Sequence, residues 1–417
     1  MLSFGTSGLR GLFGKEITPS LIFQIANRFA DGKIVGLGRD CRPSSLLLSK
    51  AAALGIMNKG SSVFDAGVVP TPTLARAYRR AIMITASHNP PEYNGIKLFE
   101  EGLELSKEDS DIYLKGKIVE DRLGEVMENH DEIVDGHVEA ILDLFDVEVD
   151  EKITVDCNGS SYVIIPKLME CLNARLISVN CSGFMNRPSE PSEANLNHLL
   201  NASIAFANDG DGDRVALIYR KKYIKGDKLL GALASFMLKK GDLFITTIET
   251  SLGVLEFLRD LGINVEITKV GSTYVGKLMK EKKVKFGGEP AGEFIFAGIS
   301  YVPDGIASIP AILTMHKEKI LDETLNSIKT YFIERRKYKV KNKNKVMNYI
   351  LNMIDIEGKR FLDDGIRIDG DDYWVLIRPS GTEPLIRLTV EAKEKTLLKS
   401  LVEKGEGLIK EGIKHES

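Results

Sequence analysis

Short apolar runs alternate with amphipathic stretches along most of the 417-residue chain, and this alternation limits the possible folds more than any other feature. Runs such as KIVGLG at 33–38 and AIMIT at 81–85 are typical of buried strands, whereas 20–31 and 46–58 have the spacing of amphipathic helices. Strands that alternate with helices form parallel sheets covered by helices. The sequence therefore predicts α/β layers, the first of them doubly wound.

The same layout recurs twice, although no strict sequence repeat is visible. A second round runs from KITVDC at 152–157 to SIAFAN at 203–208, and a third includes LFITTI at 243–248. We therefore expect three related α/β domains followed by a C-terminal α+β domain. The expected bounds are 1–135, 136–225, 226–335 and 336–417.

The last part of the chain has a different pattern. The basic stretch RRKYKVKNKNK at 335–345 is interpreted as an exposed linker rather than a nucleic-acid site. Two strand-like runs, at 365–370 and 373–392, meet a loop and precede a helix near 394–411. This order of elements predicts the α+β domain.

Composition excludes several classes of protein. A hydrophobic share of 43% and a net charge of −3 exclude a disordered chain and a global basic field that would attract a polyanion. Cys41, Cys157, Cys171 and Cys181 form no CxxC pair or zinc spacing, and no signal peptide or membrane-length apolar run is visible. We expect a soluble protein of a reducing cytoplasm, a monomer or homodimer whose partner is a small molecule, with no nucleic acid and no membrane.

An acidic loop, NDGDGDR, places aspartates at every second position: Asp209, Asp211 and Asp213. The intervening glycines permit the backbone angles that let the carboxylates converge on one hard cation. An EF-hand is excluded, because its Gly and Glu positions are occupied by Arg214 and Arg220. A solvated acidic turn stays open as the alternative, but three oxygen ligands are suited to Mg²⁺ that also binds a phosphate oxygen.

The motif RPSGTEP between two expected strands is suited to binding phosphate. Arg378 offers bidentate charge-assisted hydrogen bonds, and the turn offers free backbone N–H groups around Gly381. Further donors are Ser380, Thr382 and the nearby Arg387. The alternative is a plain hairpin turn.

The motif ITASHNPP places Ser87 just past a strand end, where α/β folds bind ligands. Either His88 activates Ser87 for acyl transfer, or Ser87 carries a phosphoryl group beside Mg²⁺. Phosphoryl chemistry is favoured, because no GxSxG elbow surrounds the serine and adjacent side chains on an extended chain point apart. Lys97 would reach the same pocket if the chain turned back at Asn94-Gly95, a hairpin signal.

Two further loops carry weaker signals. GGEPAGEF presents Glu289 and Glu293 on a tight turn, where carboxylates accept hydrogen bonds from sugar hydroxyls. FGTSGLRG presents Arg10 in a glycine-rich loop. Each is also typical of a solvated loop.

Together the loops TASHNP, DGDGDR, GEPAGE and RPSGTEP occur in the order, and in the four successive sections, of the α-D-phosphohexomutase superfamily, which the chain resembles over essentially its whole length. The resemblance implies a four-domain, heart-shaped enzyme with one active site at the domain junction. It implies a Mg²⁺-dependent mutase that moves phosphate between C1 and C6 of a sugar through a sugar 1,6-bisphosphate, which also serves as activator.

The resemblance also implies roles for individual residues. Ser87 is the expected phosphoserine, whose phosphate completes the coordination of a metal held by the three aspartates. The residues expected to line the reacting phosphoryl group are Arg10, His88, Lys97 and Arg214, with Lys97 a candidate general acid or base. Glu289 is expected to bind sugar hydroxyls. The expected distal phosphate clamp comprises Arg378, Ser380, Gly381, Thr382 and Arg387.

The sugar loop departs from the family pattern Gly-Glu-x-Ser-Gly-His at two positions. Ala291 replaces the serine and lacks its hydroxyl, and Glu293 replaces the histidine and adds a carboxylate. A second carboxylate would repel phosphate and pair with a protonated amine, which favours glucosamine phosphate over glucose or mannose phosphate. The alternative is a Glu293 that faces solvent.

The leading expectation is therefore a mutase that acts on glucosamine phosphate. A phosphoglucomutase or phosphomannomutase of broad range and a phosphopentomutase stay open. A phosphatase and a sugar-phosphate-binding regulator without turnover are alternatives from other classes. Retention of Ser87, the three aspartates and Lys97 argues against the regulator.

Overall fold

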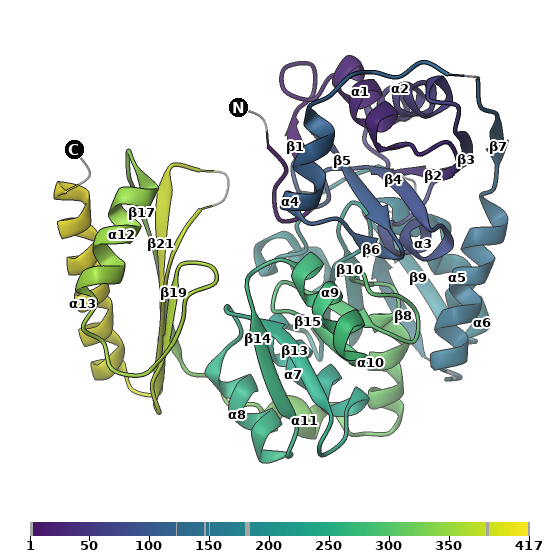
Figure 1. Ribbon diagram of the computed structural model, residues 1–417. Helices are drawn as coiled ribbons and strands as arrows, with labels where there is room; N and C mark the ends of the chain where they lie inside the picture. The colour runs from purple at the N-terminus through teal and green to yellow at the C-terminus, as the bar shows by residue number, and fades with distance from the viewer. Residues whose placement is uncertain are drawn as a thin grey trace.

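The computed structural model describes residues 3–121, 123–145, 147–149, 151–179, 184–380 and 383–415. These residues form four β-sheets, each accompanied by helices (Figure 1). Three sheets are mixed and contain adjacent parallel strands, whereas the fourth is antiparallel throughout. The expected architecture of three α/β domains and one α+β domain is confirmed.

The first domain has the sheet order β1-β5-β4-β2-β3-β7, with β6 paired to β5. Its strands are β1 (Leu9–Leu12), β2 (Ile34–Arg39), β3 (Ser62–Val68), β4 (Arg80–Ile84), β5 (Tyr93–Glu100), β6 (Leu103–Glu104) and β7 (Val126–Glu128). Its helices are α1 (Pro19–Phe29), α2 (Ser45–Asn58), α3 (Thr71–Ala77) and α4 (Lys107–Ser110), and α5 (Asp131–Leu144) follows β7.

Helices α1 and α2 show how local sequence shapes this domain. The Thr18 hydroxyl caps α1 by accepting a hydrogen bond from Leu21 N at 3.2 Å, and Pro19 is suited to the first helical position. The two helices pack closely at Gly55, where an added Cβ would lie 2.3 Å from the carbonyl oxygen of Phe23. A larger residue at position 55 would therefore push the helices apart.

The second and third domains follow in chain order. The second contains β8 (Lys152–Asp156), α6 (Ile165–Cys171), β9 (Arg175–Val179), β10 (Ile204–Asn208), β11 (Val215–Tyr219) and β12 (Lys222–Ile224). The third contains α7 (Gly226–Met237), β13 (Leu243–Thr247), α8 (Leu252–Asp260), β14 (Asn264–Thr268), α9 (Ser272–Lys282), β15 (Phe286–Glu289), β16 (Glu293–Phe296), α10 (Ser308–Lys317) and α11 (Leu321–Ser327).

The three mixed sheets share one strand arrangement. In each sheet, three parallel strands are counted in chain order, and the first lies between the second and the third. The resulting spatial orders are β4-β2-β3, β10-β8-β9 and β15-β13-β14. In each, an antiparallel strand then pairs with the third parallel strand: β5, β11 and β16 respectively. The three rounds of the sequence are therefore copies of one layout, as expected.

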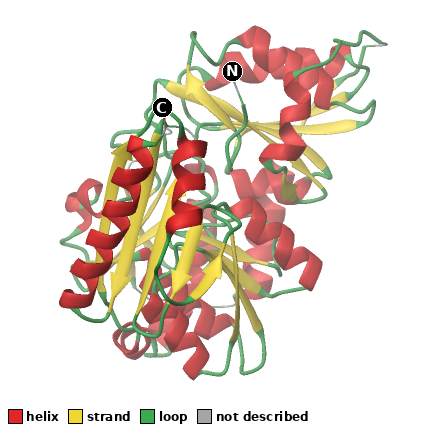
Figure 2. Cartoon of the chain, turned by 60° about the vertical axis from the view of Figure 1, so that its left-hand side comes forward, coloured by secondary structure: helices red, strands yellow, loops and turns green. Residues whose placement is uncertain are grey.

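The C-terminal domain contains β17 (Phe332–Lys339), α12 (Lys343–Met353), β18 (Lys359–Phe361), β19 (Ile366–Asp369), β20 (Tyr373–Pro379), β21 (Leu385–Ala392) and α13 (Lys395–Lys414). Its sheet order is β17-β21-β20-β19-β18. The two long helices lie across one face of the sheet (Figure 2). The domain has its own apolar core between this face and the helices.

The expectation of a linker at 335–345 is wrong for its first part, because β17 covers Phe332–Lys339 and pairs with β21. The many basic side chains of this strand made its sequence resemble that of a linker. An edge strand leaves one face and one edge in water, so alternate Lys and Arg residues are tolerated there and discourage pairing with other chains. Two expected domain bounds also fall inside elements: 335/336 in β17 and 135/136 in α5.

The C-terminal domain docks on the third domain through an apolar cluster centred on Trp374. Trp374 is fully buried and clusters with Ile248, Leu252 and Leu376. The Glu391 carboxylate accepts hydrogen bonds from the Trp374 indole and from the backbone N–H of Leu252. These two hydrogen bonds join the C-terminal sheet to the start of α8.

Within the described residues, no helix is long and apolar enough to cross a membrane. Cys41 and Cys171 are free thiols, and Cys157 is disulfide-bonded. The cysteine spacing did not predict this bond, so the cysteines give no support to the expectation of a reducing compartment.

Candidate active site

Three of the four predicted loops occupy the same position in their sheets. The Ser87 loop joins β4 to β5, the aspartate loop joins β10 to β11, and the sugar loop joins β15 to β16. Each loop thus leaves the carboxyl end of the third parallel strand, where α/β sheets bind ligands. Because the three domains repeat one topology, packing them together brings equivalent loops to one junction.

Ser87 lies at this junction and is 1% exposed. Its Oγ donates a hydrogen bond to Asp209 Oδ2 at 2.9 Å, which joins the first domain to the second. Its φ of 50° lies in the left-handed region, which is costly for a residue with a Cβ and is found most often at functional sites. The surrounding structure therefore holds Ser87 in a specific orientation.

His88 lies closer to Ser87 than we expected. Its Nδ1 is 3.4 Å from Ser87 Oγ, because the left-handed turn at Ser87 removes the extended backbone on which the expectation rested. Burial, followed by the charges of Arg214 and Arg10, lowers the pKa of His88 to about 2. The nearest carboxylate, Glu190, is 3.9 Å from Nε2, beyond hydrogen-bond distance. A Ser-His-carboxylate triad for acyl transfer is therefore not formed among these residues.

The three aspartates of the acidic loop are buried and adjacent. One carboxylate oxygen from each lies within 4.8 Å of the others. Burial and the neighbouring carboxylates raise the pKa of Asp209 well above its ordinary value. The Oδ1 atoms of Asp211 and Asp213 are buried without a hydrogen-bond partner among the described residues. Unpartnered, negatively charged oxygens at one point are the donor set of a divalent cation, so the residues present fit a metal.

Lys97 places a positive charge in direct contact with two of these carboxylates. Its Nζ lies 2.7 Å from Asp213 Oδ2 and 2.9 Å from Asp211 Oδ2, and the side chain is 1% exposed. Burial alone would lower the pKa of Lys97, but the two carboxylates outweigh it and raise the pKa above its ordinary value. The stem packs on Gly8, where an added Cβ would lie 2.9 Å from Lys97 Cγ.

The route by which Lys97 reaches the site differs from the expected one. Asn94 and Gly95 lie inside strand β5 and form no hairpin turn. The chain reverses earlier, in the loop between Ile84 and Tyr93, which the two prolines of ITASHNPP keep out of regular structure. Gly95 is required for sheet packing instead, because an added Cβ would lie 2.1 Å from the carbonyl oxygen of Leu9.

Arg10 and Arg214 are both close enough to His88 for their charges to lower its pKa. Arg10 Nη1 donates to Asn89 Oδ1 at 3.3 Å, and its Nε is buried without a partner among the described residues. Arg214 Nη1 donates to Glu190 Oε2 at 2.8 Å, and Arg214 Nη2 lies 2.7 Å from Glu293 Oε1. Arg214 therefore joins the aspartate loop to the sugar loop.

The sugar loop presents two buried carboxylates. Glu289 and Glu293 are 7% and 6% exposed and face each other across the β15–β16 hairpin. Burial and the adjacent Glu293 raise the pKa of Glu289 well above its ordinary value, whereas Arg214 outweighs burial and lowers the pKa of Glu293. Glu293 therefore does not face solvent, and the alternative left open by the sequence is wrong. Ala291, at the turn, is exposed.

The phosphate loop lies in the C-terminal domain, between β20 and β21. Arg378 Nη1 lies 3.2 Å from Glu249 Oε1 of the third domain, and the Nε atoms of Arg378 and Arg387 are buried without partners among the described residues. Ser380 is 2% exposed, and its Oγ accepts a hydrogen bond from Glu383 N. The predicted clamp residues Gly381 and Thr382 lie outside the described residues.

The structure thus brings the first three loops together but not the fourth. Among the described hydrogen bonds and ion pairs, none joins Arg378, Ser380 or Arg387 to the Ser87 or aspartate loops. The C-terminal sheet stands apart from the first domain and adjoins the third (Figure 1). A ligand that contacts both Ser87 and the phosphate loop would therefore have to extend from the first domain to the C-terminal domain.

Sequence reasoning missed several residues that surround the site. Thr71, at the start of α3, donates its hydroxyl proton to Asp211 Oδ2 at 2.6 Å. Asp40 and Arg42 follow β2 at the same sheet edge as Ser87. Asp40 and Arg42 could have been found from the sequence, because they directly follow an expected parallel strand. Glu190 follows no strand, so nothing in the sequence marked it.

Comparison with known proteins identifies the family. Three models of the phosphoglucomutase/phosphomannomutase family match the chain: alpha/beta/alpha domain I at residues 1–116, alpha/beta/alpha domain III at 225–331, and the C-terminal domain at 335–405. A phosphoglucosamine mutase of Methanocaldococcus jannaschii is 39% identical to this chain. The alignment is 447 residues long and covers 98% of each chain.

Two solved structures share the fold. A phosphoglucomutase/phosphomannomutase family protein of Burkholderia thailandensis has a TM-score of 0.87 at 23% identity, covering 98% of this chain and 97% of its own. The N-acetylphosphoglucosamine mutase of Aspergillus fumigatus, solved with GlcNAc-6P and magnesium, has a TM-score of 0.68 at 13% identity, covering 99% and 96%. The chain therefore belongs to the phosphoglucomutase/phosphomannomutase family within the α-D-phosphohexomutase superfamily, and it is a sugar-phosphate mutase, an isomerase.

Proposed function

We propose that this mutase interconverts glucosamine 1-phosphate and glucosamine 6-phosphate through a phosphorylated Ser87. One observation carries the proposal: Ser87 Oγ lies 2.9 Å from Asp209, beside a buried carboxylate cluster that also contacts Lys97. A serine that is to donate and regain a phosphoryl group needs a cation on one side and positive side chains on the other. The first two domains supply the carboxylates that would hold the cation and the positive side chain of Lys97.

Two balanced transfers make up one turnover. First, the bond between phosphorus and Ser87 Oγ breaks, phosphorus bonds to a sugar hydroxyl oxygen, the sugar hydroxyl loses its proton and Ser87 Oγ gains one, which leaves a sugar 1,6-bisphosphate. The bisphosphate then reverses in the site. Second, Ser87 Oγ loses its proton and bonds to the phosphorus of the other phosphoryl group, and the sugar oxygen that this group leaves gains a proton. Lys97 is the candidate general acid or base.

Side chains of this protein hold the reacting groups. His88 Nδ1 lies 3.4 Å from Ser87 Oγ, and Arg10 and Lys97 are the cationic side chains that would offset charge on the phosphoryl group. When bound by Asp209, Asp211 and Asp213, with Ser87 phosphate as a further ligand, Mg²⁺ would offset negative charge on the transferring phosphoryl group. Arg378, Ser380 and Arg387 would hold the phosphate that does not react, and Gly381 and Thr382 are proposed with them.

Local charge supports an amino sugar. Glu190 and Glu293 both pair with the single cation Arg214, so negative charge exceeds positive charge there even when Glu289 is protonated. A protonated sugar amine would restore the balance, whereas a neutral sugar would not. The relative from Methanocaldococcus jannaschii carries the name phosphoglucosamine mutase. Broad phosphoglucomutase or phosphomannomutase activity and phosphopentomutase activity are the competing outcomes.

The metal, the activator, the cellular location and the oligomeric state were also predicted from the sequence. We propose Mg²⁺ as the metal and a sugar 1,6-bisphosphate as activator. A cytoplasmic location and a monomeric or homodimeric state stay predictions.

The test is ³¹P NMR of purified protein with Mg²⁺ and a trace of the matching bisphosphate. Glucosamine, glucose, mannose and ribose phosphates are offered separately, with Ser87→Ala as the control. The expected result is fastest interconversion of glucosamine phosphate, lost in the control. Faster turnover of another sugar would overturn the substrate, and inorganic phosphate formed faster than product would identify a phosphatase. A phosphorylated Ser87 without interconversion would identify a binding protein.

A further inference from the structure

The backbone of the Ser87 loop is held from inside by one arginine. Arg42 donates hydrogen bonds to four backbone carbonyl oxygens of this loop: Ser87 at 2.7 Å, Asn89 at 2.8 Å, Tyr93 at 3.1 Å, and Pro90. The residue as a whole is 2% exposed, so these bonds form in the protein interior. A planar guanidinium suits this task, because its donors point in fixed, divergent directions.

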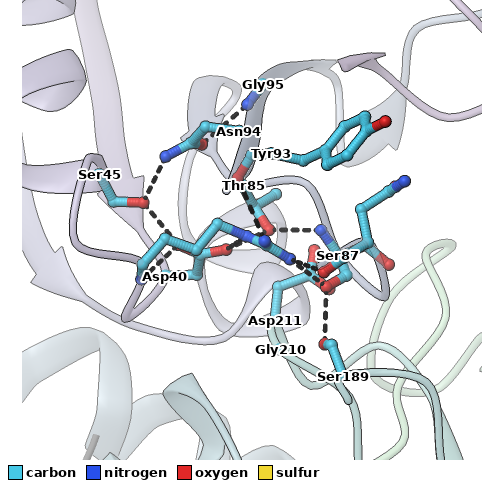
Figure 3. A network of polar contacts seen from close by, with 12 residues as sticks. Asp40, Ser45, Thr85, Ser87, Tyr93, Asn94, Gly95, Ser189, Gly210 and Asp211 are labelled. Atoms are coloured by element: carbon cyan, nitrogen blue, oxygen red, sulfur yellow. Dashed lines mark hydrogen bonds and ion pairs between the residues drawn. The ribbon is translucent and has the colours of Figure 1, made fainter. Parts of the chain in front are cut away.

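Asp40 holds Arg42 in place. Its Oδ2 accepts from Arg42 Nε at 2.9 Å, and its Oδ1 accepts from the Arg42 backbone N–H at 3.0 Å. The same carboxylate accepts from the hydroxyls of Ser45 at 2.5 Å and Thr85 at 2.7 Å (Figure 3). Every acceptor position of this buried carboxylate is thus used, which fixes it firmly.

Both backbone polar groups of Ser87 are bound by this network. The Ser87 N–H donates to Thr85 Oγ1 at 2.8 Å, and Thr85 in turn donates to Asp40 (Figure 3). The Ser87 carbonyl accepts from Arg42 and from Ser189 Oγ, at 2.9 Å, of the second domain. With its N–H and C=O both fixed, Ser87 keeps the left-handed φ that directs Oγ toward Asp209.

The Arg42–Asp40 network fixes the position of Ser87 but adds no net charge to the site. Arg42 and Asp40 form a fully buried ion pair, with 0% of either side chain exposed, so their charges cancel locally. The positive charge in contact with the aspartate cluster, to which Ser87 is hydrogen-bonded, comes from Lys97 instead. A change in Arg42 should therefore move the reacting oxygen without altering how strongly a sugar phosphate is attracted.

We propose that Arg42, held by Asp40, is a positioning residue that keeps the phosphoryl group of Ser87 aligned for transfer to the sugar rather than to water. This inference rests on the proposed function. In the unwanted reaction, a water oxygen bonds to phosphorus, the bond to Ser87 Oγ breaks, and the serine oxygen gains a proton, releasing inorganic phosphate. A displacement of about 1 Å can cost on the order of 100-fold in rate.

The first test compares Arg42→Lys with Arg28→Lys. Arg28 also donates to backbone carbonyls of the first domain, those of Gly116, Tyr113 and Leu114, but none belongs to the Ser87 loop. Lysine keeps the charge but cannot reach four divergent acceptors. We expect Arg42→Lys to lower kcat by roughly 100-fold, with KM changed by less than about 2-fold, and to raise inorganic phosphate released per mutase turnover. Arg28→Lys should change none of these.

A second pair of variants keeps the proposal testable if Arg42→Lys fails to fold. Thr85→Val keeps the shape but removes the hydroxyl that links Asp40 to the Ser87 N–H, and Thr85→Ser restores that hydroxyl. Phosphate release per turnover should rise in Thr85→Val and return toward the wild-type value in Thr85→Ser. Equal values in the two Thr85 variants, or an Arg42→Lys enzyme that matches Arg28→Lys, would overturn the inference. Wild-type protein without Ser87-dependent turnover would instead overturn the proposed function.

Discussion

Arg214 Nη2 lies 2.7 Å from Glu293 Oε1, so the metal loop of the second domain and the sugar loop of the third are joined by a nearly buried ion pair. The side chains are 13% and 8% exposed. A change at Glu293 therefore reaches the aspartate loop directly through Arg214.

Substrate preference should depend on this carboxylate. Replacing Glu293 by glutamine keeps a hydrogen-bond acceptor for Arg214 but removes the negative charge that favours an amine. We expect kcat/KM for glucosamine phosphate relative to glucose phosphate to fall roughly 10-fold, about 1.4 kcal/mol. The control is Glu266→Gln, which alters a half-exposed carboxylate of the same domain paired with Lys282. An unchanged ratio would contradict the role of Glu293.

Metal binding should stabilise the folded protein. The three buried carboxylates repel one another, and a cation that binds only the folded state relieves this repulsion. At a Mg²⁺ concentration near 100 times Kd, the gain should be about 2.7 kcal/mol. Differential scanning calorimetry with and without Mg²⁺ measures the shift in Tm. The shift should vanish in Asp213→Asn, and an equal shift in that variant would place the metal elsewhere.

Glu104 should make stability depend on pH. Burial raises the pKa of this carboxyl to about 7, against an ordinary value of 4.5, although Lys97 and a hydrogen bond from Ser7 oppose the rise. A raised folded-state pKa means that the folded protein retains a proton that the unfolded chain has lost. The resulting stabilisation is complete below about pH 4.5 and is lost as the pH rises to about 7.

The check is Tm of the wild type and of Glu104→Gln measured between pH 4.5 and 8. The wild type should lose stability relative to the variant across this window, since glutamine does not titrate. Parallel profiles for the two proteins would show that Glu104 titrates at an ordinary pKa.

The distal phosphate should be bound by Arg378. Arg378→Lys replaces a bidentate fork by a point charge, and we expect KM for the sugar phosphate to rise roughly 10-fold. Phosphorylation of Ser87 by a bisphosphate should remain detectable by intact mass. Arg360→Lys, in strand β18 of the same domain, is the control and should leave KM unchanged. A normal KM in Arg378→Lys would remove this residue from the clamp.

Substrate should draw the C-terminal domain toward the other three. Arg378 Nη1 lies 3.2 Å from Glu249 Oε1, so a phosphate that binds Arg378 would compete with a carboxylate of the third domain. Small-angle X-ray scattering should show a smaller radius of gyration with sugar phosphate and Mg²⁺ than without. No compaction with ligand would count against closure, and Arg378→Lys supplies the matched comparison.

Much of the site was predictable from sequence, because chemistry-bearing residues stand in short motifs. The aspartates of DGDGDR are neighbours in the chain, and the glycines between them permit the carboxylates to converge. Ser87 follows an apolar run and Glu289 ends the parallel strand β15, and the ends of parallel strands are where α/β folds place such residues. The resemblance of four loops in order then supplied the mutase chemistry.

Other features could not be read from sequence, because they arise from contacts between distant segments. Composition made β17 look like a linker, since an edge strand accepts charged residues. The Asn94-Gly95 pair resembled a turn, but backbone packing against Leu9 places it within β5.

Sequence by itself determined the repeated α/β layout, the motifs and the class of chemistry, because periodicity and local spacing act over a few residues. Tertiary structure alone decided that Glu293 pairs with Arg214, that Lys97 lies between two aspartates, and that Arg42 holds the Ser87 loop. The first two of these contacts lie between domains, and the third lies within the first domain; all three involve buried charged or polar groups. Their partners are selected by the cost of leaving them unpaired away from water, and that cost exists only once the chain has folded.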